Sequence, residues 1–201
     1  MVLLIRRILF GLMLCAASTA SWAATEPNSA VTWDVKALMR DLAQVKSAKA
    51  TFVEQKYLSI LTKPLESSGT LIYTAPDRLE KHTLLPKPES MILERDSITL
   101  ENKTKNQRRT VMLQDYPVIW TFVESIRSTL AGDLETLNRF YKVKLEGNSN
   151  EWHLSMAPSQ RAMQDVVSEI RIDGNKNRIK TITINEASGD RSVMKINEDS
   201  Q

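Results

Sequence analysis

The sequence contains little of what catalytic and metal sites are usually built from. Its 201 residues include one cysteine, two histidines and six glycines. The histidines, His82 and His153, fall on separate predicted strands, and the chain has neither a His-Glu-x-x-His helix nor a Gly-x-Ser-x-Gly elbow. Glycine is too sparse for a phosphate-binding loop. We therefore predict a protein that is not an enzyme and that holds no metal or cofactor.

The N-terminal segment has the features of an export signal. Arg6 and Arg7 precede an apolar run that is too short to anchor stably in a bilayer. A Ser-Trp-Ala sequence ends at Ala23 and predicts cleavage after that residue. We expect residues 1–23 to be a cleaved signal peptide.

Cleavage would leave a single domain, residues 24–201, without cysteine, because Cys15 lies in the signal. That domain would have no disulfide, no thiol chemistry and no thiolate metal site. Lys plus Arg would fall from 27 to 25 against 24 Asp plus Glu, and the formal net charge from +3 to +1. A nearly neutral domain gives no argument for nucleic-acid binding.

Short apolar runs recur at intervals of about ten residues and are joined by polar turns, a spacing that favours an antiparallel sheet. The predicted strands cover residues 48–61, 69–75, 78–85, 89–94, 98–102, 107–113, 142–146, 152–157, 166–172, 178–185 and 192–197. One sheet of about eleven strands has to curl. We therefore predict a mainly β (α+β) fold, an incomplete and strongly curved antiparallel barrel.

Three segments have helical rather than strand periodicity. Apolar residues at helical spacing predict an N-terminal helix with Thr32 as its N-cap. Two more helices, over residues 118–130 and 134–140, are inserted between the two groups of strands. Gly132 is expected to end the first of these helices and Asp133 to cap the second.

The predicted helix over residues 118–130 is apolar over a wide arc. Ile119, Val123 and Ile126 share one face, and Trp120 lies away from it. Such a helix is either deeply buried or faces two apolar environments. Core packing and a lid over an apolar cavity both remain open.

The predicted strand over residues 78–85 carries charge on both faces. Arg78, Glu80 and His82 alternate with Lys81. Long basic side chains can cover apolar surface with their stems while their heads reach water. We therefore interpret this strand as part of a wet rim or a roomy interior.

A basic group surrounds one predicted hairpin tip and comprises Lys103, Lys105, Arg108 and Arg109. It is either a solvated turn or a patch that meets anionic headgroups or an acidic partner. No aromatic residues are interleaved with it, which disfavours nucleic acid.

The order of motifs along the chain resembles the periplasmic outer-membrane lipoprotein carrier (LolA) family, in particular its carrier-like branch. The matching stretches are Ala50-Thr51-Phe52-Val53-Glu54-Gln55, Ser68-Gly69-Thr70-Leu71-Ile72-Tyr73, Pro76-Asp77-Arg78-Leu79, Tyr116-Pro117, Leu130-Ala131-Gly132-Asp133, Trp152-His153-Leu154 and Met156-Ala157-Pro158. The resemblance implies an open barrel with a helical lid in the periplasm of a Gram-negative cell. It also implies a monomeric, non-catalytic carrier that binds acyl chains of a lipid or lipoprotein. Such a carrier takes its cargo from an inner-membrane donor and passes it to an outer-membrane acceptor. Ala75 stands where the founding carriers have the arginine that latches the lid.

Apolar residues on the predicted strands and lid are the candidates for lining the cavity, and methionines suit it because they adapt to irregular ligands. The candidates are Leu71, Tyr73, Met91, Leu93, Leu100, Met112, Trp120, Phe122, Ile126, Phe140, Trp152 and Met156.

Two other functions are also compatible with the sequence. One is a structural or adaptor envelope protein with a filled core that docks on partners through a sheet edge or the basic hairpin. The other is a lipid-processing hydrolase that uses His82 or His153.

Overall fold

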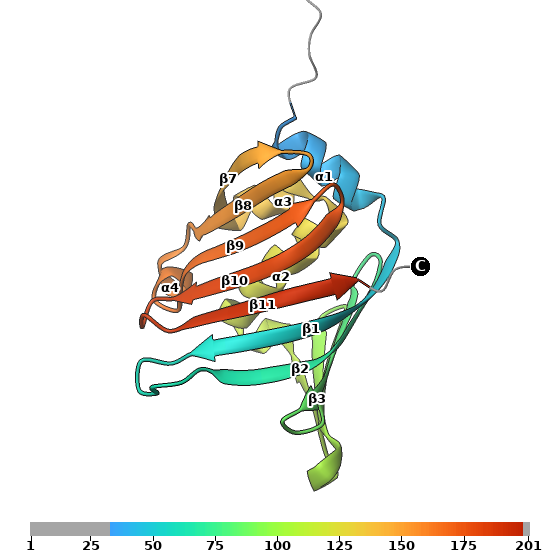
Figure 1. Cartoon of the computed structure of the whole chain (residues 1–201), viewed down its shortest axis with the longest axis vertical. Coiled ribbons are helices and arrows are strands. Elements are labelled where there is room, and N and C mark those ends of the chain that lie inside the picture. Colours follow the sequence, from blue (N-terminus) through green and yellow to red (C-terminus); the bar gives the residue numbers. More distant parts are fainter. Residues whose placement is uncertain (1–32, 199–201) are drawn as a thin grey trace, which may run out of the picture. The chain divides into compact units, whose positions relative to one another are not determined.

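A single antiparallel sheet dominates the computed structural model, which describes residues 33–198 (Figure 1). Its eleven strands are β1 (Ser47–Tyr57), β2 (Leu65–Thr74), β3 (Arg78–Leu85), β4 (Glu89–Glu94), β5 (Ser97–Asn102), β6 (Gln107–Met112), β7 (Tyr141–Asn148), β8 (Glu151–Pro158), β9 (Val167–Asn175), β10 (Arg178–Glu186) and β11 (Arg191–Glu198). The strand order is β6-β5-β4-β3-β2-β1-β11-β10-β9-β8-β7. The predicted incomplete, curved barrel of about eleven strands is confirmed. The predicted signal peptide lies outside the described residues.

The sheet consists of two meanders joined by its first and last strands. All neighbours except β1 and β11 are consecutive in the chain. Pairing of β1 with β11 sets Phe52 opposite Ile196 and Glu54 opposite Met194. The two strands at the centre of the sheet are therefore the ones farthest apart in sequence.

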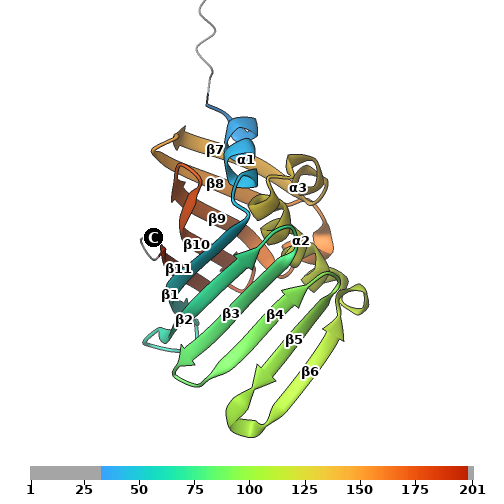
Figure 2. The ribbon, with the colours of Figure 1, turned by 90° about the vertical axis from the view of Figure 1, so that its right-hand side faces the viewer.

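The helices lie on one face of this sheet (Figure 2). They are α1 (Val35–Ala43), α2 (Pro117–Ala131), α3 (Leu134–Phe140) and α4 (Arg161–Gln164), with short 3-10 turns η1 (Lys103–Lys105) and η2 (Leu113–Asp115). The insertion of α2 and α3 between the two meanders is as predicted. Among the described residues, no helix is long and apolar enough to cross a membrane.

The helix caps follow the sequence with one correction. Gly132 ends α2 in the left-handed conformation, and the Asp133 side chain accepts a hydrogen bond from the Thr136 backbone amide at 3.0 Å, as predicted. The N-cap of α1 is Asp34, whose carboxylate accepts from the Ala37 amide at 2.8 Å. The predicted Thr32 cap is therefore wrong, because Asp34 supplies the same capping chemistry two residues later.

Two separate cores form where the helices press against the ends of the sheet. The larger joins α1 and α3 to strands β7–β9 and contains Leu38, Met39, Leu42, Leu137, Tyr141, Trp152, Leu154, Met156, Met163, Val167, Ile170 and Ile172. The smaller joins α2 to strands β4 and β5 and contains Leu93, Ile98, Leu113 and Val123. The central strands lie between the two cores, and the inward side chains of these strands border a cavity.

Candidate functional site

A cavity of about 540 Å³ lies between α2 and the inward face of the central strands. Its volume is within the range of small-molecule and cofactor sites. From β10 and β11 come Ile179, Ile182, Ile184, Met194 and Ile196, and from α2 come Val118, Ile119, Phe122, Ile126, Thr129 and Leu130. The lining is therefore mainly aliphatic.

Helix α2 forms the cover of this cavity and is held mainly by other helices. Its nearest backbone neighbours are α3, α1, α4 and η2. Buried residues of α2 have hydroxyls that bond back to the helix itself. Ser125 donates to the Phe122 carbonyl at 2.6 Å and Thr129 to the Ser125 carbonyl at 2.7 Å. These hydroxyls are therefore satisfied within α2, and Thr129 lines the cavity beside Phe122 and Ile126.

The wide apolar arc of α2 is divided between two environments. Phe122 and Ile126 face the cavity, while Val123 belongs to the smaller core. Trp120 packs against that core and meets the Phe140 ring edge-on, with ring centroids 5.2 Å apart. Both readings of this helix, core packing and lid, therefore apply to different faces of it.

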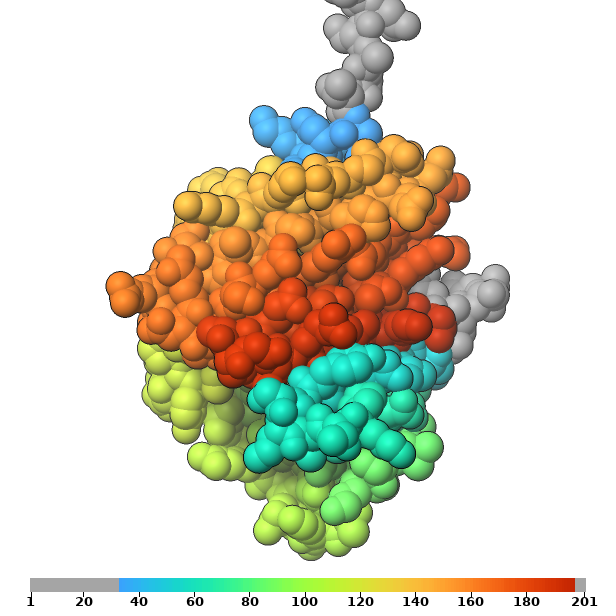
Figure 3. All heavy atoms as spheres, turned by 60° about the vertical axis from the view of Figure 1, so that its left-hand side comes forward, coloured from blue at the N-terminus to red at the C-terminus, as the bar shows by residue number. Residues whose placement is uncertain are grey.

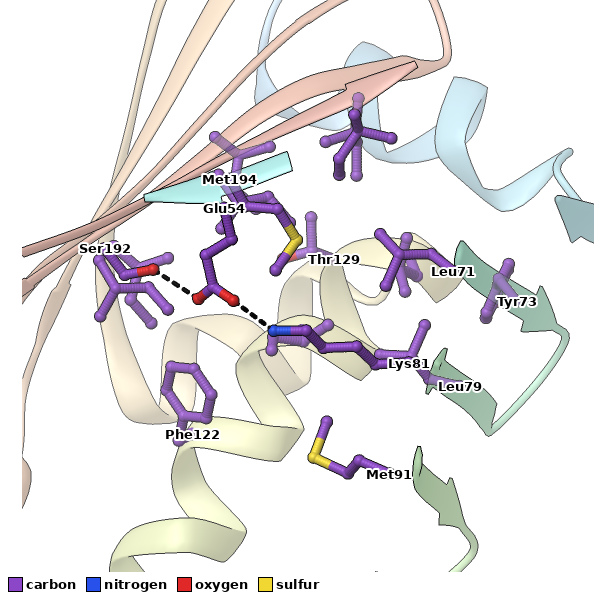
Figure 4. A pocket seen from close by; sticks show the side chains of 18 of the residues that line it. Glu54, Leu71, Tyr73, Leu79, Lys81, Met91, Phe122, Thr129, Ser192 and Met194 are labelled. Carbon is purple, nitrogen blue, oxygen red and sulfur yellow. Dashed lines mark hydrogen bonds and ion pairs between the residues drawn. The ribbon is translucent and has the colours of Figure 1, made fainter. Parts of the chain in front are cut away.

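One polar cluster interrupts the apolar lining (Figure 4). Glu54 of β1 is only 5% exposed and accepts hydrogen bonds from Lys81 Nζ at 2.5 Å and Ser192 Oγ at 2.7 Å. Ser67 Oγ lies 3.4 Å from the same carboxylate, and Lys56 Nζ lies 4.0 Å from it. The Lys81 ammonium also lies 4.9 Å from the centre of the Phe52 ring. The buried carboxylate is thus fully paired within the wall.

The surroundings of Glu54 keep it ionised. Burial alone would raise the pKa of this carboxyl, since it disfavours the charged form. The hydrogen bonds from Lys81 and Ser192, together with the charges of Lys81 and Lys56, outweigh that effect and lower the pKa below its usual value. Glu54 and Lys81 therefore form an ion pair at neutral pH.

The charges of β3 are divided by the alternation of the strand. On the outer face, Arg78 donates to Glu80 and to Glu94, each at 2.8 Å, and His82 Nε2 lies 2.8 Å from Glu80. Lys81 alone points to the inner face, where it reaches Glu54. The predicted roomy interior is the cavity, and Lys81 lies in its wall.

Only some of the residues expected from the sequence to line the cavity do so in the structure. Leu71, Tyr73, Met91, Phe122 and Ile126 line the cavity. Leu93 lies in the smaller core, Trp152 and Met156 lie in the larger one, and Trp120 and Phe140 pack beside them. Leu100 borders a neighbouring groove and Met112 is exposed at the β6 edge. The residues of β8 are drawn into a core because α1 and α3 cover that end of the sheet, and β6 is an uncovered edge strand.

Tyr73 is notable among the residues that do line the cavity. It is buried, and its hydroxyl has no hydrogen-bond partner among the described residues. A buried hydroxyl without a partner is unfavourable. It is therefore a donor that a bound molecule could satisfy.

Several lining residues lie outside the sequence candidates. They include Glu54, Lys81, Ser192, Met194 and the isoleucines of β9 and β10. The signal for Glu54 was the alternation Ala50, Phe52, Glu54, which places a carboxylate on a buried face. Its partner Lys81 could be found only once the strand register was known.

The meander formed by strands β1–β6, called the outer meander below, carries a second depression of about 630 Å³ beside the cavity. Lys81 and Met91 border both spaces, and Leu100, Glu89 and Arg109 border only the second. Within residues 33–198, no group of three or more acidic, histidine or cysteine side chains could hold a metal ion.

Comparison with known proteins identifies the family. The sequence model of the outer membrane lipoprotein carrier protein LolA-like family matches residues 25–196. The chain belongs to the LolA-like family. Members of this family are generally non-catalytic binding proteins. A search of curated protein sequences gives no match.

Solved structures with a similar fold are distant in sequence from this LolA-like chain. A LolA superfamily protein from Nitrosomonas europaea is 8% identical, with a TM-score of 0.44, over 84% of this chain and 94% of that one. The MucA/MucB complex of Pseudomonas aeruginosa gives 14% identity and a TM-score of 0.45, over 83% of this chain and 57% of the other. A putative outer membrane lipoprotein-sorting protein domain from Vibrio parahaemolyticus gives 7% and 0.41, over 83% and 89%.

Ala75 and Arg78 of this LolA-like chain form hydrogen bonds away from α2. The Ala75 amide donates to the Lys46 carbonyl at 2.9 Å. Arg78 pairs with carboxylates on the outer face of the sheet rather than with α2. Arg127 ties α2 to strands β4 and β5 by donating to the Arg95 carbonyl between them, and it also pairs with Glu124 of α2 itself.

Proposed function

We propose that the protein is a non-catalytic periplasmic carrier that binds acyl chains of a lipid or lipoprotein in the cavity beneath α2. In this proposal it moves them from an inner-membrane donor to an outer-membrane acceptor. The observation that carries the proposal is an aliphatic cavity covered by a helix that is anchored mainly to other helices. Such a cover can move outward without separating strands of the sheet.

The energetics suit a reversible carrier. Each buried methylene contributes about 0.8 kcal/mol, so ten methylenes contribute roughly 8 kcal/mol, which corresponds to a micromolar dissociation constant. Opening of α2 subtracts from that gain. Binding is then tight enough for transport and weak enough for release.

The polar groups of the wall give the ligand an orientation. The acyl chain would lie along the isoleucines and Met194. The headgroup linkage would lie toward the Tyr73 hydroxyl or the remaining donors of the Lys81 ammonium. An amphiphile with a carbonyl or carboxylate at the head of an acyl chain fits this pattern better than a pure hydrocarbon.

The test is uptake of a fluorescent fatty acid, combined with native mass spectrometry of protein isolated from the periplasm. Ile182→Trp fills the cavity from β10 and should lower uptake at least tenfold. Val53→Trp adds similar bulk on the outer face of the sheet and should leave uptake unchanged. Equal uptake by both variants, or an absence of bound lipid and of uptake in the parent protein, would refute the proposal.

A further inference from the structure

Three turns of the outer meander lie at the same end of the sheet. Strands β1 to β6 pair in consecutive antiparallel order, so the β1–β2, β3–β4 and β5–β6 turns share one end (Figure 2). The β2–β3 and β4–β5 turns lie at the opposite end. The two ends differ in both polarity and charge.

The shared end exposes large apolar side chains. Ile60, in the β1–β2 turn, is 87% exposed, and Leu61 and Leu65 beside it are also exposed. Leu84 and Leu85 are exposed where β3 ends. Single exposed apolar residues are ordinary, but a group of them on adjoining turns marks a surface that contacts something.

The β1–β2 turn is fixed in this exposed position. The Ser59 amide donates to Asp190 Oδ1 at 2.8 Å, and the Leu61 amide donates to the Leu58 carbonyl at 2.9 Å. At the base of the turn, the Arg191 guanidinium lies 4.7 Å from the centre of the Tyr57 ring. Figure 3 shows the turn on the surface beside the start of β11. Its apolar tip is therefore presented outward rather than folded back onto the domain.

Positive charge accompanies the apolar residues. Lys63 lies in the first turn, Lys87 in the second, and Lys103 and Lys105 in the third, and all four are exposed. None of the three turns contains an acidic residue; the carboxylate beside the first turn is Asp190, between β10 and β11, and it accepts from the Ser59 amide.

The opposite end of the same strands lacks this combination. The β2–β3 turn contains Asp77 and the β4–β5 turn contains Asp96. Neither turn has a large exposed apolar side chain. The polarity is therefore a property of one end, rather than of turns in general.

We propose that the end formed by these three turns, the basic apolar end, docks on an anionic lipid surface. Apolar residues that penetrate the headgroup region, flanked by lysines that meet anionic headgroups, are the two components of reversible membrane binding. A protruding apolar tip with cations on three turns fits a bilayer interface better than the flat, hydrogen-bonded rim of a protein interface. The docking does not depend on a ligand in the cavity.

The first experiment is sedimentation of the purified protein with vesicles of phosphatidylglycerol and phosphatidylcholine. We expect binding at low salt, at least fivefold weaker binding at 0.5 M salt, and little binding to phosphatidylcholine alone. Ile60→Asp should reduce binding at least tenfold. Val53→Asp, at an exposed valine on the outer face of β1, should not. No binding to anionic vesicles, or equal binding by Ile60→Asp and the parent protein, would overturn the proposal.

Further variants separate charge, insertion and ligand uptake. Lys103→Gln with Lys105→Gln should weaken binding severalfold, whereas Lys36→Gln with Lys142→Gln, on α1 and β7, should not. The fluorescence of Ile60→Trp should shift to shorter wavelength on anionic vesicles, and an unshifted spectrum would contradict insertion of the turn. Ile60→Asp should still take up a fluorescent fatty acid in solution, so loss of docking and loss of cavity binding can be told apart. Sedimentation of the parent protein without vesicles, abolished in Ile60→Asp, would overturn the proposal and show that this end binds a second copy of the chain.

Discussion

Glu54 on β1 and Lys81 on β3 form an ion pair of 2.5 Å across the intervening strand β2, within a largely aliphatic wall. The Lys81 side chain is 20% exposed and that of Glu54 is 6% exposed. Removing a charge from water is costly, so a buried carboxylate is tolerated in this wall when it is paired with a cation and not when it is unpaired. Breaking the pair should therefore lower the stability of the folded protein, and the pair is also a polar feature of the cavity wall.

Lys81→Met should destabilise the protein by about 3 kcal/mol, because it leaves the buried Glu54 carboxylate with only the more distant Lys56 ammonium, at 4.0 Å, as a cation. Lys81→Met combined with Glu54→Gln should recover part of that loss. Urea unfolding measures both values, and Lys49→Met, at an exposed lysine on the outer face of β1, is the matched control. A double variant no more stable than the single one would show that the pairing is not the cause.

Glu54 should also make stability depend on pH. Its pKa is lower in the folded protein than in the unfolded chain, so the unfolded state binds the proton more readily. The stabilisation is complete well above the unfolded value of about 4.3 and is lost as pH falls below it, through the lower folded-state pKa. The unfolding free energies of the parent protein and Glu54→Gln should differ at pH 7 and converge as pH falls through that acidic range. Parallel curves for the two proteins would contradict this assignment.

Gly132→Ala should disturb the packing of α2 on α1. Gly132 has a φ of 71°, and an added Cβ would lie 2.1 Å from the Met39 carbonyl oxygen. We expect a loss of at least about 2 kcal/mol in thermal or urea unfolding, since strain and a clash combine. Gly189 has a φ of 91°, but an added Cβ there would meet open space. Gly189→Ala should therefore lower the free energy of unfolding by only about 1 kcal/mol. Equal losses would mean that contact with α1 contributes nothing.

Tyr73→Phe removes a buried hydroxyl that has no partner among the described residues. The ligand-free protein should therefore be unchanged or slightly more stable in thermal unfolding. Under the proposed function, affinity for a fatty acid should fall severalfold, while affinity for an alkane-like probe stays the same. Tyr116→Phe, at an exposed tyrosine, is the control, and an identical effect on both probes would argue against a hydrogen bond to the ligand.

Arg127→Met should loosen the cover of the cavity. It removes the hydrogen bond that joins α2 to the Arg95 carbonyl, together with an ion pair to Glu124 within α2 itself. Stopped-flow release of a bound fluorescent lipid should become severalfold faster. Arg139→Met removes a comparable but exposed pair with Glu135 on α3 and should leave release unchanged. Unchanged release in Arg127→Met would show that this tie does not limit opening.

Local signals determined much of the fold. Period-two alternation and turn residues were enough for the strands, and helical spacing was enough for α2 and α3. Gly132 and Asp133 stand at the helix ends where their backbone and capping chemistry place them. The start of α1 was predicted only to within two residues, because Thr32 and Asp34 can both act as N-caps.

The tertiary structure alone decided which residues meet in the cavity. Alternation defines two faces of a strand but not which one is concave, so Leu71 and Met91 were no more strongly indicated than Leu93 or Trp152. The site depends on pairing between β1 and β11, which brings Ser192 to Glu54 across 138 positions of sequence. Lys81, one of several charges on β3, is selected by curvature and register. Short-range periodicity therefore determined the elements of this protein, and long-range strand pairing determined its site.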